Sequence, residues 1–292
     1  MEDIAARRVA ETLLAEHKGN VRFRTLTPPD GPANISDSYD IQQRYVALLR
    51  DAYGDTAGYK VGLTSATMQQ FCKIDHPIGG VVLAKRVHRS GATVQRRDYG
   101  RLGLEFEVAV RFKSDVPVMA QTRETVAPHI DGVCAAIELV DDRSADYGSL
   151  DVRSLVADNS WNAGIVLSEF ATTWPDLEAM LGRATRDGTA IGEGFGRDIL
   201  GHPFNSAAWM ATQLASRGEG IKAGQVVMTG SVMKTVFPEE AGNYRFFIYS
   251  DDASQLWLST DDKEANLNMI AEETGCCNNF TEPDSPRTSE PI

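Results

Sequence analysis

The sequence lacks the features that would place it in several specialised classes of protein. Its four cysteines form no CxxC pair and no regular framework, which argues against a disulfide-bonded secreted scaffold. No apolar run approaches the roughly 18 residues that a membrane-spanning helix needs. Residues 2–18 carry charges at helical spacing instead of the apolar segment of a signal peptide. We therefore expect a cytoplasmic protein with no membrane partner.

Positive charge is also scarce. The chain of 292 residues holds 29 lysines and arginines against 41 acidic residues, a formal net charge of −12, and it has no basic run. Binding to nucleic acid or to an anionic membrane depends on basic patches, so neither partner is expected. A small anionic substrate stays possible, because a bound metal ion can reverse the field locally. No GxGxxG or P-loop motif is present.

The pattern of apolar residues predicts an α+β protein. Two amphipathic helices are expected at 2–18 and 37–52, and further helices at 174–181, 203–217 and 264–273. Between them lie short, β-branched segments punctuated by glycine, which are typical of a β-rich core. These segments are 79–83, 92–94, 104–112, 135–140, 164–167, 226–228, 244–248 and 255–258. We predict an N-terminal helical segment (1–57), a catalytic core (58–262) and a partly disordered tail (263–292).

Two acids share a strand-like segment, Leu104–Val110. Residues i and i+2 of a strand point to the same face, so Glu105 and Glu107 project together. Neighbouring carboxylates repel each other unless a cation or a shared proton intervenes, and a hard divalent cation prefers such oxygen ligands. A solvated acidic strand face is the alternative interpretation.

A third acid, Glu138, lies in the almost wholly apolar segment Ala135–Val140. Burial of a lone glutamate costs free energy unless the carboxylate is paired or bound to a metal. Arg143 follows closely and could form an ion pair with Glu138. The metal interpretation is favoured over that pair.

A lysine lies in the apolar, glycine-flanked segment Gly58–Ser65. A buried lysine can have a lowered pKa and act as an acid or base, or it can bind an anion. The alternative for Lys60 is a surface lysine whose aliphatic stem alone is covered.

Six segments, taken in their order along the chain, resemble the fumarylacetoacetate hydrolase superfamily. Within it they resemble the branch of 2-keto-4-pentenoate hydratases and 4-oxalocrotonate decarboxylases. The resemblance spans roughly residues 5–260. Its segments are GYKVGLTS (58–65), LEFEVAV (104–110), AAIELVDDR (135–143), VADN (156–159), ILGHPFNSAAWMA (199–211) and IKAGQVVMTGS (221–231).

The resemblance implies a mixed β-sandwich or roll with an N-terminal helical segment, and it implies a homo-oligomer. It implies a Mg²⁺ or Mn²⁺ site, whose ligands would be Glu105, Glu107 and Glu138. The expected catalytic residues are Lys60, Asp75 and Asp158, and the expected substrate-binding residues are Leu63, His76 and Ser231.

One position departs from the hydratase pattern. Many hydratases of this branch have an acid/base aspartate in a Pro-Asp-Tyr/Phe-Gly motif, where this chain has Ile78. An apolar residue there is closer to the decarboxylases. Asp75 and His76 are the candidates to replace the missing acid by positioning water.

The predicted function is a metal-dependent lyase that adds water to a 2-hydroxy-2,4-dienoate or a 2-oxo-alkenoate. One alternative is a 2-oxo acid decarboxylase of the 4-oxalocrotonate type. Another is a hydrolase that cleaves a C–C bond of an acylpyruvate or 1,3-diketone, although no local His–Glu pair supports it. A non-catalytic, metal-binding subunit is the fourth. The loops around 64–80, 143–162 and 231–238 hold Phe71, Tyr147, Trp161 and Phe237, which favours a substrate with a non-polar tail.

Overall fold

The computed structural model describes residues 1–239, 242–246, 254–259 and 267–273. Its helices are α1 (Asp3–Lys18), α2 (Ile35–Tyr53), α3 (Ala66–Phe71), α4 (Arg123–Val126), α5 (Val152–Ala157) and α6 (Pro203–Ala215). Its strands are β1 (Thr56–Gly62), β2 (Ile78–Leu83), β3 (Val87–Arg89), β4 (Thr93–Gln95), β5 (Leu102–Phe112), β6 (Ile130–Asp141), β7 (Asn162–Leu167), β8 (Leu181–Arg186), β9 (Thr189–Phe195), β10 (Val226–Ser231), β11 (Asn243–Arg245), β12 (Ser254–Ser259) and β13 (Leu267–Glu273).

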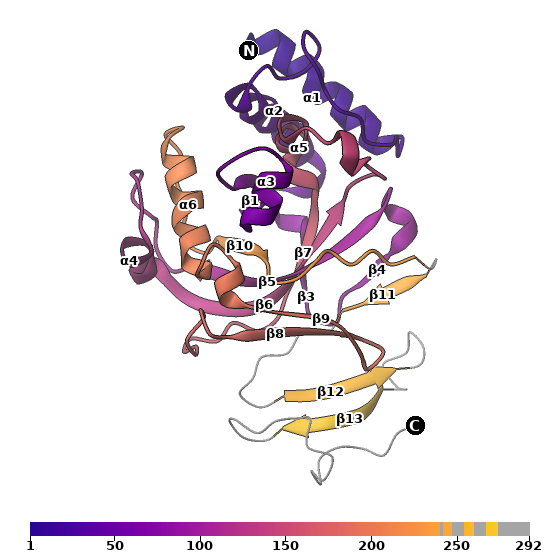
Figure 1. Cartoon of the computed structure of the whole chain (residues 1–292), viewed down its shortest axis with the longest axis vertical. Helices are drawn as coiled ribbons and strands as arrows, with labels where there is room; N and C mark the ends of the chain where they lie inside the picture. The colour runs from indigo at the N-terminus through magenta and orange to yellow at the C-terminus, as the bar shows by residue number, and fades with distance from the viewer. Residues whose placement is uncertain (240–241, 247–253, 260–266, 274–292) are drawn as a thin grey trace.

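A seven-stranded mixed sheet forms the centre of the molecule (Figure 1). The strand order is β2-β1-β10-β5-β6-β7-β3, with β1 parallel to β10, β3 parallel to β7 and the other pairs antiparallel. Strand β2 also contacts β7, although four strands separate the two in the sheet order. The sheet is therefore strongly curved, and the approach of β2 to β7 closes off its concave side.

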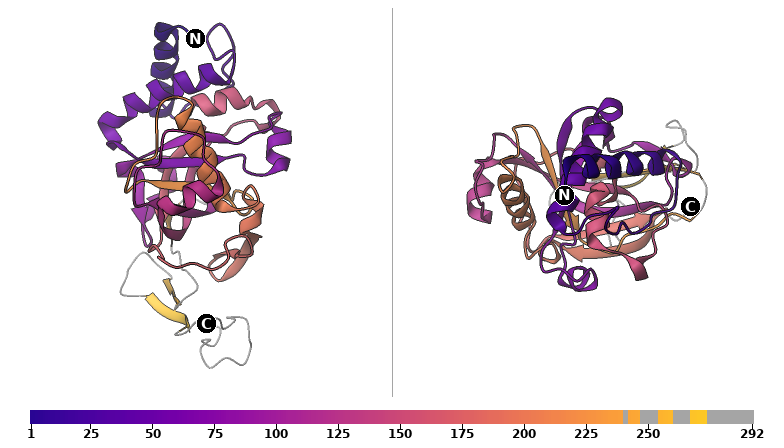
Figure 2. Two further views of the ribbon diagram at one scale, coloured as in Figure 1. Left: turned by 90° about the vertical axis from the view of Figure 1, so that its left-hand side faces the viewer. Right: turned by 90° about the horizontal axis from the view of Figure 1, so that it is seen from above.

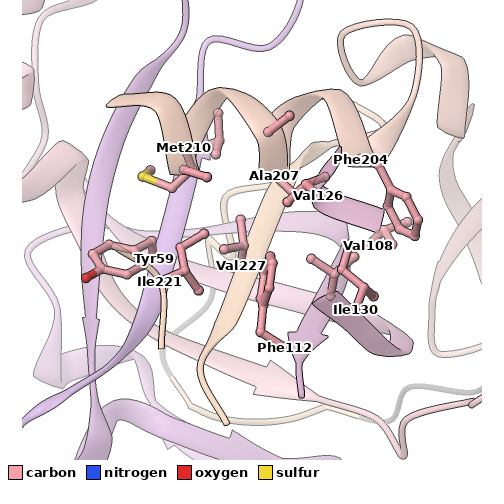
Figure 3. Close-up of a cluster of buried hydrophobic side chains, with 14 of the residues drawn as sticks. Tyr59, Val108, Phe112, Val126, Ile130, Phe204, Ala207, Met210, Ile221 and Val227 are labelled. Atoms are coloured by element: carbon pink, nitrogen blue, oxygen red, sulfur yellow. The ribbon is translucent and has the colours of Figure 1, made fainter. Parts of the chain in front are cut away.

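One face of the sheet packs against α6. Alternate residues of the strands, such as Tyr59, Val108 and Val227, meet Ala207 and Met210 of the helix in the largest apolar cluster (Figure 3). Successive side chains of a strand point to opposite faces, so the neighbouring positions Lys60 and Glu107 necessarily face the other way. Packing of α6 thus directs these charged residues toward the concave side.

Helices α1 and α2 pack against each other at one end of the molecule (Figure 2). Their buried residues include Val9, Leu13, Ile41 and Leu49, which fall on one stripe of each helix. The Asn34 side chain accepts a hydrogen bond from the backbone N–H of Asp37 and so caps α2. Both predicted N-terminal helices are confirmed, as is the α+β class.

Two predicted helices are wrong. In place of a helix at 174–181, the chain turns and enters the β8–β9 hairpin at Leu181. The hairpin forms because Asp187 and Gly188 both adopt positive φ, the conformation of a type I′ turn. The end of the helix predicted at 264–273 is strand β13, whose backbone pairs with β12. The start of that helix, and the tail beyond residue 273, lie outside the described residues.

Among the residues that the structure describes, no helix is both long enough and apolar enough to cross a membrane. The division of the chain into three segments stays a prediction.

Candidate metal centre

Three glutamates converge on the concave side of the sheet. Glu105 and Glu138 lie directly opposite each other in the antiparallel pair β5–β6, and Glu107 lies two residues further along β5. One carboxylate oxygen from each residue lies within 4.8 Å of the other two. The strand alternation predicted for Glu105 and Glu107 is therefore confirmed, and β6 supplies the third acid from the neighbouring strand.

Each glutamate has one oxygen held by a neutral hydrogen-bond donor. The contacts are Thr235 Oγ1 to Glu105 Oε1 at 2.7 Å, the Gly230 N–H to Glu107 Oε2 at 2.9 Å, and Asn162 Nδ2 to Glu138 Oε1 at 2.8 Å. The three contacts orient the carboxylates and leave one oxygen of each for another ligand. Neutral donors achieve this without cancelling the negative charge of the cluster.

Burial makes this cluster electrostatically unfavourable on its own. Two unit charges 4.8 Å apart repel by about 3.5 kcal/mol at an effective dielectric constant of about 20. Burial raises the pKa of Glu107 well above its usual range, and the charges of Glu138 and Glu105 raise it further. Burial also raises the pKa of Glu138 to about 7, although Lys60 acts in the opposite direction. Neutralisation of the cluster therefore needs more positive charge than Lys60 provides.

The free oxygens fit a hard divalent cation. Glu107 Oε1 is buried and has no hydrogen-bond partner within the described part of the chain. Glu138 Oε2 likewise has no hydrogen bond of good geometry and faces only the Lys60 ammonium group, at 3.2 Å. An unpaired buried carboxylate oxygen costs more than the roughly 1–3 kcal/mol of a neutral polar group. Mg²⁺ and Mn²⁺ prefer oxygen donors of this kind, so the three glutamates would hold either ion.

Lys60 is the cation beside this cluster, and it is only 4% exposed. Its ammonium group contacts Glu138 Oε2 and donates to the backbone oxygen of Ser160 at 3.3 Å. Burial disfavours the ammonium form, but the charges of Glu138, Glu105 and Glu107 outweigh burial and raise the pKa of Lys60. The surface-lysine interpretation is wrong, and the pKa of Lys60 moves up in this metal-free site rather than down.

Arg143 does not neutralise Glu138. Its guanidinium group donates to Asp158 Oδ2 at 2.7 Å and lies 3.7 Å from Glu16 Oε2. The other oxygen of Asp158 lies 2.6 Å from His17 Nε2. Asp158 thus joins α1 to the core, and its contacts are with these residues rather than with the glutamates or Lys60. A catalytic role for Asp158 stays a prediction.

Of the predicted substrate-binding residues, Ser231 lies beside the glutamates, opposite Glu107 in the β10–β5 pair. The Ser231 hydroxyl group donates to Met233 O at 2.8 Å and bonds the backbone of Phe106, the residue between the two β5 glutamates. Leu63 is half-buried and adopts a positive φ of 56° directly after β1. His76 is half-buried, with Nδ1 2.7 Å from the Pro77 carbonyl oxygen.

Position 78 lies next to the lysine. A Cβ atom added to Gly62 would lie 3.3 Å from Lys60 Nζ and 3.5 Å from Ile78 Cγ1. Ile78 is 1% exposed, so it presents a dry, apolar surface beside the ammonium group. Asp75, by contrast, is exposed. Any water that reacts here would need a polar partner other than residue 78.

The sequence analysis missed Thr235 and Asn162 as partners of the glutamates, and the backbone of Gly230. No local pattern marks the two side chains. Gly230 lies in the TGS segment, and its φ of 111° and the 2.4 Å separation between an added Cβ and Thr64 Oγ1 require glycine. In the sequence, the glycine between the two polar residues of the TGS segment was the signal that the backbone lies close to another group.

Metal affinity is expected to depend on pH because Glu138 must lose its proton to bind a cation. The pKa of Glu138 is raised from 4.5 to about 7, so its protonated form contributes stability to the metal-free protein below about pH 4.5. That contribution is lost as the pH rises through about 7. Metal binding should strengthen over the same window, by up to about tenfold per pH unit for each proton released, and the raised pKa of Glu107 extends the rise to higher pH.

Isothermal titration of Mn²⁺ between pH 5.5 and 8.5, in two buffers of different ionisation enthalpy, measures both the affinity and the protons released. An affinity that stays constant across this range would contradict the protonation of Glu138 in the metal-free site. Glu193→Gln, on the exposed pair of β8 and β9, is the matched control and should leave the profile unchanged.

The chain is similar to known proteins both in sequence and in structure. The family model described as fumarylacetoacetate (FAA) hydrolase C-terminal matches residues 53–277. A 2-hydroxyhexa-2,4-dienoate hydratase from Comamonas testosteroni is 30% identical over 224 residues, 75% of this chain and 83% of that protein. A 2-keto-4-pentenoate hydratase from Burkholderia vietnamiensis is 30% identical over 230 residues, 76% and 86% of the two chains. The 4-oxalocrotonate decarboxylase from Pseudomonas putida G7, solved with magnesium and adipate, is similar in structure (TM-score 0.74, 26% identity, covering 83% of this chain and 92% of that chain).

Proposed function

Because the chain belongs to the fumarylacetoacetate hydrolase family, we propose that it is a divalent-metal-dependent lyase of the 2-keto-4-pentenoate hydratase type. Its substrate would be a small 2-hydroxy-2,4-dienoate or its 2-oxo tautomer, to which it adds water. The observation that carries this proposal is the convergence of three oriented glutamates, one of which contacts the buried ammonium group of Lys60.

Glu105, Glu107 and Glu138 would hold Mg²⁺ or Mn²⁺ through the oxygens that Thr235, Gly230 and Asn162 leave free. The ion would act as a Lewis acid toward the oxygens of a 2-oxo acid. The glutamates contribute their negative charge and their fixed orientation. Burial excludes bulk water, so charge–charge interactions at the centre are stronger than they would be at the surface.

Lys60 would carry the proton. Two of its three N–H groups are directed to Glu138 and to the Ser160 carbonyl group, which leaves one for the substrate. Ketonisation of a dienoate removes the proton of the C2 hydroxyl group and adds one at C5. Water then adds across the remaining C3–C4 double bond, with its oxygen at C4. In the first stage Lys60 would relay the proton from the C2 oxygen toward C5, and in the second it would supply a proton at C3 that the added water replaces.

The proposal is tested by assays of 2-hydroxypenta-2,4-dienoate and 2-oxo-3-hexenedioate with Mg²⁺, following loss of ultraviolet absorbance and release of CO₂. We expect loss of dienoate without CO₂, and no reaction after chelation of the metal. Absence of dienoate hydration in protein that binds Mg²⁺ would contradict the hydratase proposal.

Decarboxylation is the second candidate, and Ile78 is the observation that favours it. A buried isoleucine beside Lys60 cannot position water, and loss of CO₂ needs no water. Release of CO₂ from 2-oxo-3-hexenedioate would decide for this reaction. C–C hydrolysis by a His–Glu pair receives less support, because no hydrogen bond joins a histidine to a glutamate within the described residues.

Metal binding without turnover of any of these 2-oxo acids would instead support the non-catalytic subunit. We also propose that the protein acts in the cytoplasm, and that it is a homo-oligomer, as the resemblance to its family implies. Tyr147 and Trp161 pack with Leu63 and Ile78 in one apolar cluster, which supports a substrate with a non-polar tail. Phe71 is 49% exposed, so this support does not extend to it.

A further inference from the structure

An irregularity in the β6–β7 pair brings Asn162 to the metal centre. Leu139 pairs with Gly164 and Val140 pairs with Asn162, so Ala163 has no partner and the register shifts there. An extra residue of this kind bends the strand and redirects a side chain, and such bulges are common beside functional sites. Here Asn162 is only 5% exposed, and its side chain reaches Glu138.

The contact fixes the orientation of the Glu138 carboxylate. Asn162 Nδ2 donates to Oε1, and the other oxygen, Oε2, lies 3.2 Å from Lys60 Nζ. The last torsion of a glutamate side chain is broad and roughly two-fold, and a carboxylate without a fixed donor has no preferred orientation. A hydrogen bond to a charged group is worth about 1.5–3 kcal/mol, which is enough to select one orientation.

The backbone of Asn162 is anchored independently of its side chain. Arg86 donates to the Asn162 carbonyl oxygen at 3.0 Å, and its guanidinium group lies 3.9 Å from the centre of the Tyr53 ring. The preceding residues 159–161 all have φ between 49° and 60°, and the carbonyl group of Ser160 accepts the Lys60 contact. One short segment therefore positions both Lys60 and Glu138.

The far end of the Asn162 amide has no partner. An ionised carboxylate only accepts hydrogen bonds, so the NH₂ group of Asn162 must face Glu138 and Oδ1 must face away. Oδ1 is buried and lacks a hydrogen-bond partner among the described residues. An asparagine kept only for structure would pair both ends inside the protein, because an unpaired buried acceptor costs about 1–3 kcal/mol.

From these contacts, we propose that Asn162 is a positioning residue of the metal centre. Its amide holds Glu138 with Oε2 turned toward the cation, and this sets the affinity for the metal. The inference rests on the proposed metal site but not on the identity of the substrate.

The test is Mn²⁺ binding to Asn162→Leu, which keeps the size of the side chain and removes the donor. The Kd for Mn²⁺, measured by isothermal titration, is expected to rise about 10- to 100-fold, as for other partners of metal ligands. The rise in Tm between chelated and Mn²⁺-loaded protein should shrink accordingly. A purely structural role would lower both melting temperatures equally and leave Kd unchanged, which would overturn the proposal.

Asn162→Ser provides a second variant if the leucine protein does not fold. Serine is small and polar but too short to reach Glu138, so the same loss of affinity is expected. Asn205→Leu is the matched control, because Asn205 donates to the Leu200 carbonyl oxygen at 2.8 Å, away from the metal centre. That variant should bind Mn²⁺ as the wild type does.

Failure of the wild-type protein to bind Mn²⁺ would overturn both this inference and the metal site, whereas inactivity toward dienoates would affect only the proposed reaction.

Discussion

Glu107→Gln is expected to weaken Mn²⁺ binding by about 100-fold or more, beyond the roughly 10- to 100-fold loss seen when only a partner of a ligand is removed. Glu107 Oε2 accepts from the Gly230 N–H, and Oε1 has no hydrogen-bond partner in the described structure. A glutamine amide has only one acceptor oxygen. If its NH₂ group faces the Gly230 N–H, two hydrogen-bond donors oppose each other. If the NH₂ group faces the cation instead, a donor opposes a positive charge.

The same substitution should stabilise the metal-free protein. Burial and the charges of Glu138 and Glu105 disfavour the ionised form of Glu107, and a glutamine at this position carries no charge at any pH. The new NH₂ group can donate to a neighbouring carboxylate while its oxygen keeps the bond from Gly230. We therefore expect the Tm of chelated protein to rise, by about 2–4 °C for each kcal/mol gained, and the activity to be lost.

Differential scanning calorimetry with and without Mn²⁺, together with isothermal titration, measures both effects. Glu193→Gln is the control, since Glu193 lies on the surface 3.3 Å from Arg183 and should change neither quantity. Wild-type affinity in the Glu107→Gln protein would show that Glu107 is not a ligand. A lower Tm for the chelated variant would show that the cluster is already neutralised by protons.

Lys60→Met is expected to have the opposite effect on metal binding. Removal of the ammonium group leaves the three carboxylates, two of them buried, without a cation, and loss of one partner of a buried ion pair costs about 3–5 kcal/mol. The metal-free variant should therefore be less stable. Binding of Mn²⁺ should restore the lost stability and should tighten, because no positive charge competes with the ion. If Lys60 transfers the proton, kcat should fall by about 10²- to 10⁴-fold even at saturating metal.

This combination separates proton transfer from metal ligation. Substitution of a metal ligand lowers both the metal affinity and the activity, whereas substitution of a proton carrier lowers the activity alone. Lys222→Met is the matched control, because Lys222 pairs with Asp115 at 2.9 Å on the surface. Full activity in metal-loaded Lys60→Met protein would exclude Lys60 from catalysis. Weaker Mn²⁺ binding in this variant would indicate that Lys60 organises the glutamates instead.

Several features of the fold could be predicted from short segments. Helices α1 and α2 follow from apolar residues at helical spacing, and β5 follows from alternation along Leu102–Phe112. The prediction of a helix at 174–181 is wrong, and it did not take into account the Asp187-Gly188 turn that follows. Apolar periodicity over eight residues does not separate a helix from an irregular segment, because both can bury Trp174 against Phe204.

The sequence by itself determined that Glu105 and Glu107 lie on one face, because side-chain direction along a strand depends only on local backbone geometry. It also marked Glu138 as an acid in an apolar strand that needs a partner. Only the tertiary structure decided that this partner is Lys60 and that Arg143 pairs with Asp158 instead. Strand pairing and the β6–β7 bulge bring Thr235, Gly230 and Asn162 to the three carboxylates. These contacts join residues from 24 to 130 positions apart, so they depend on how the whole chain packs, and no short segment shows which residues pair.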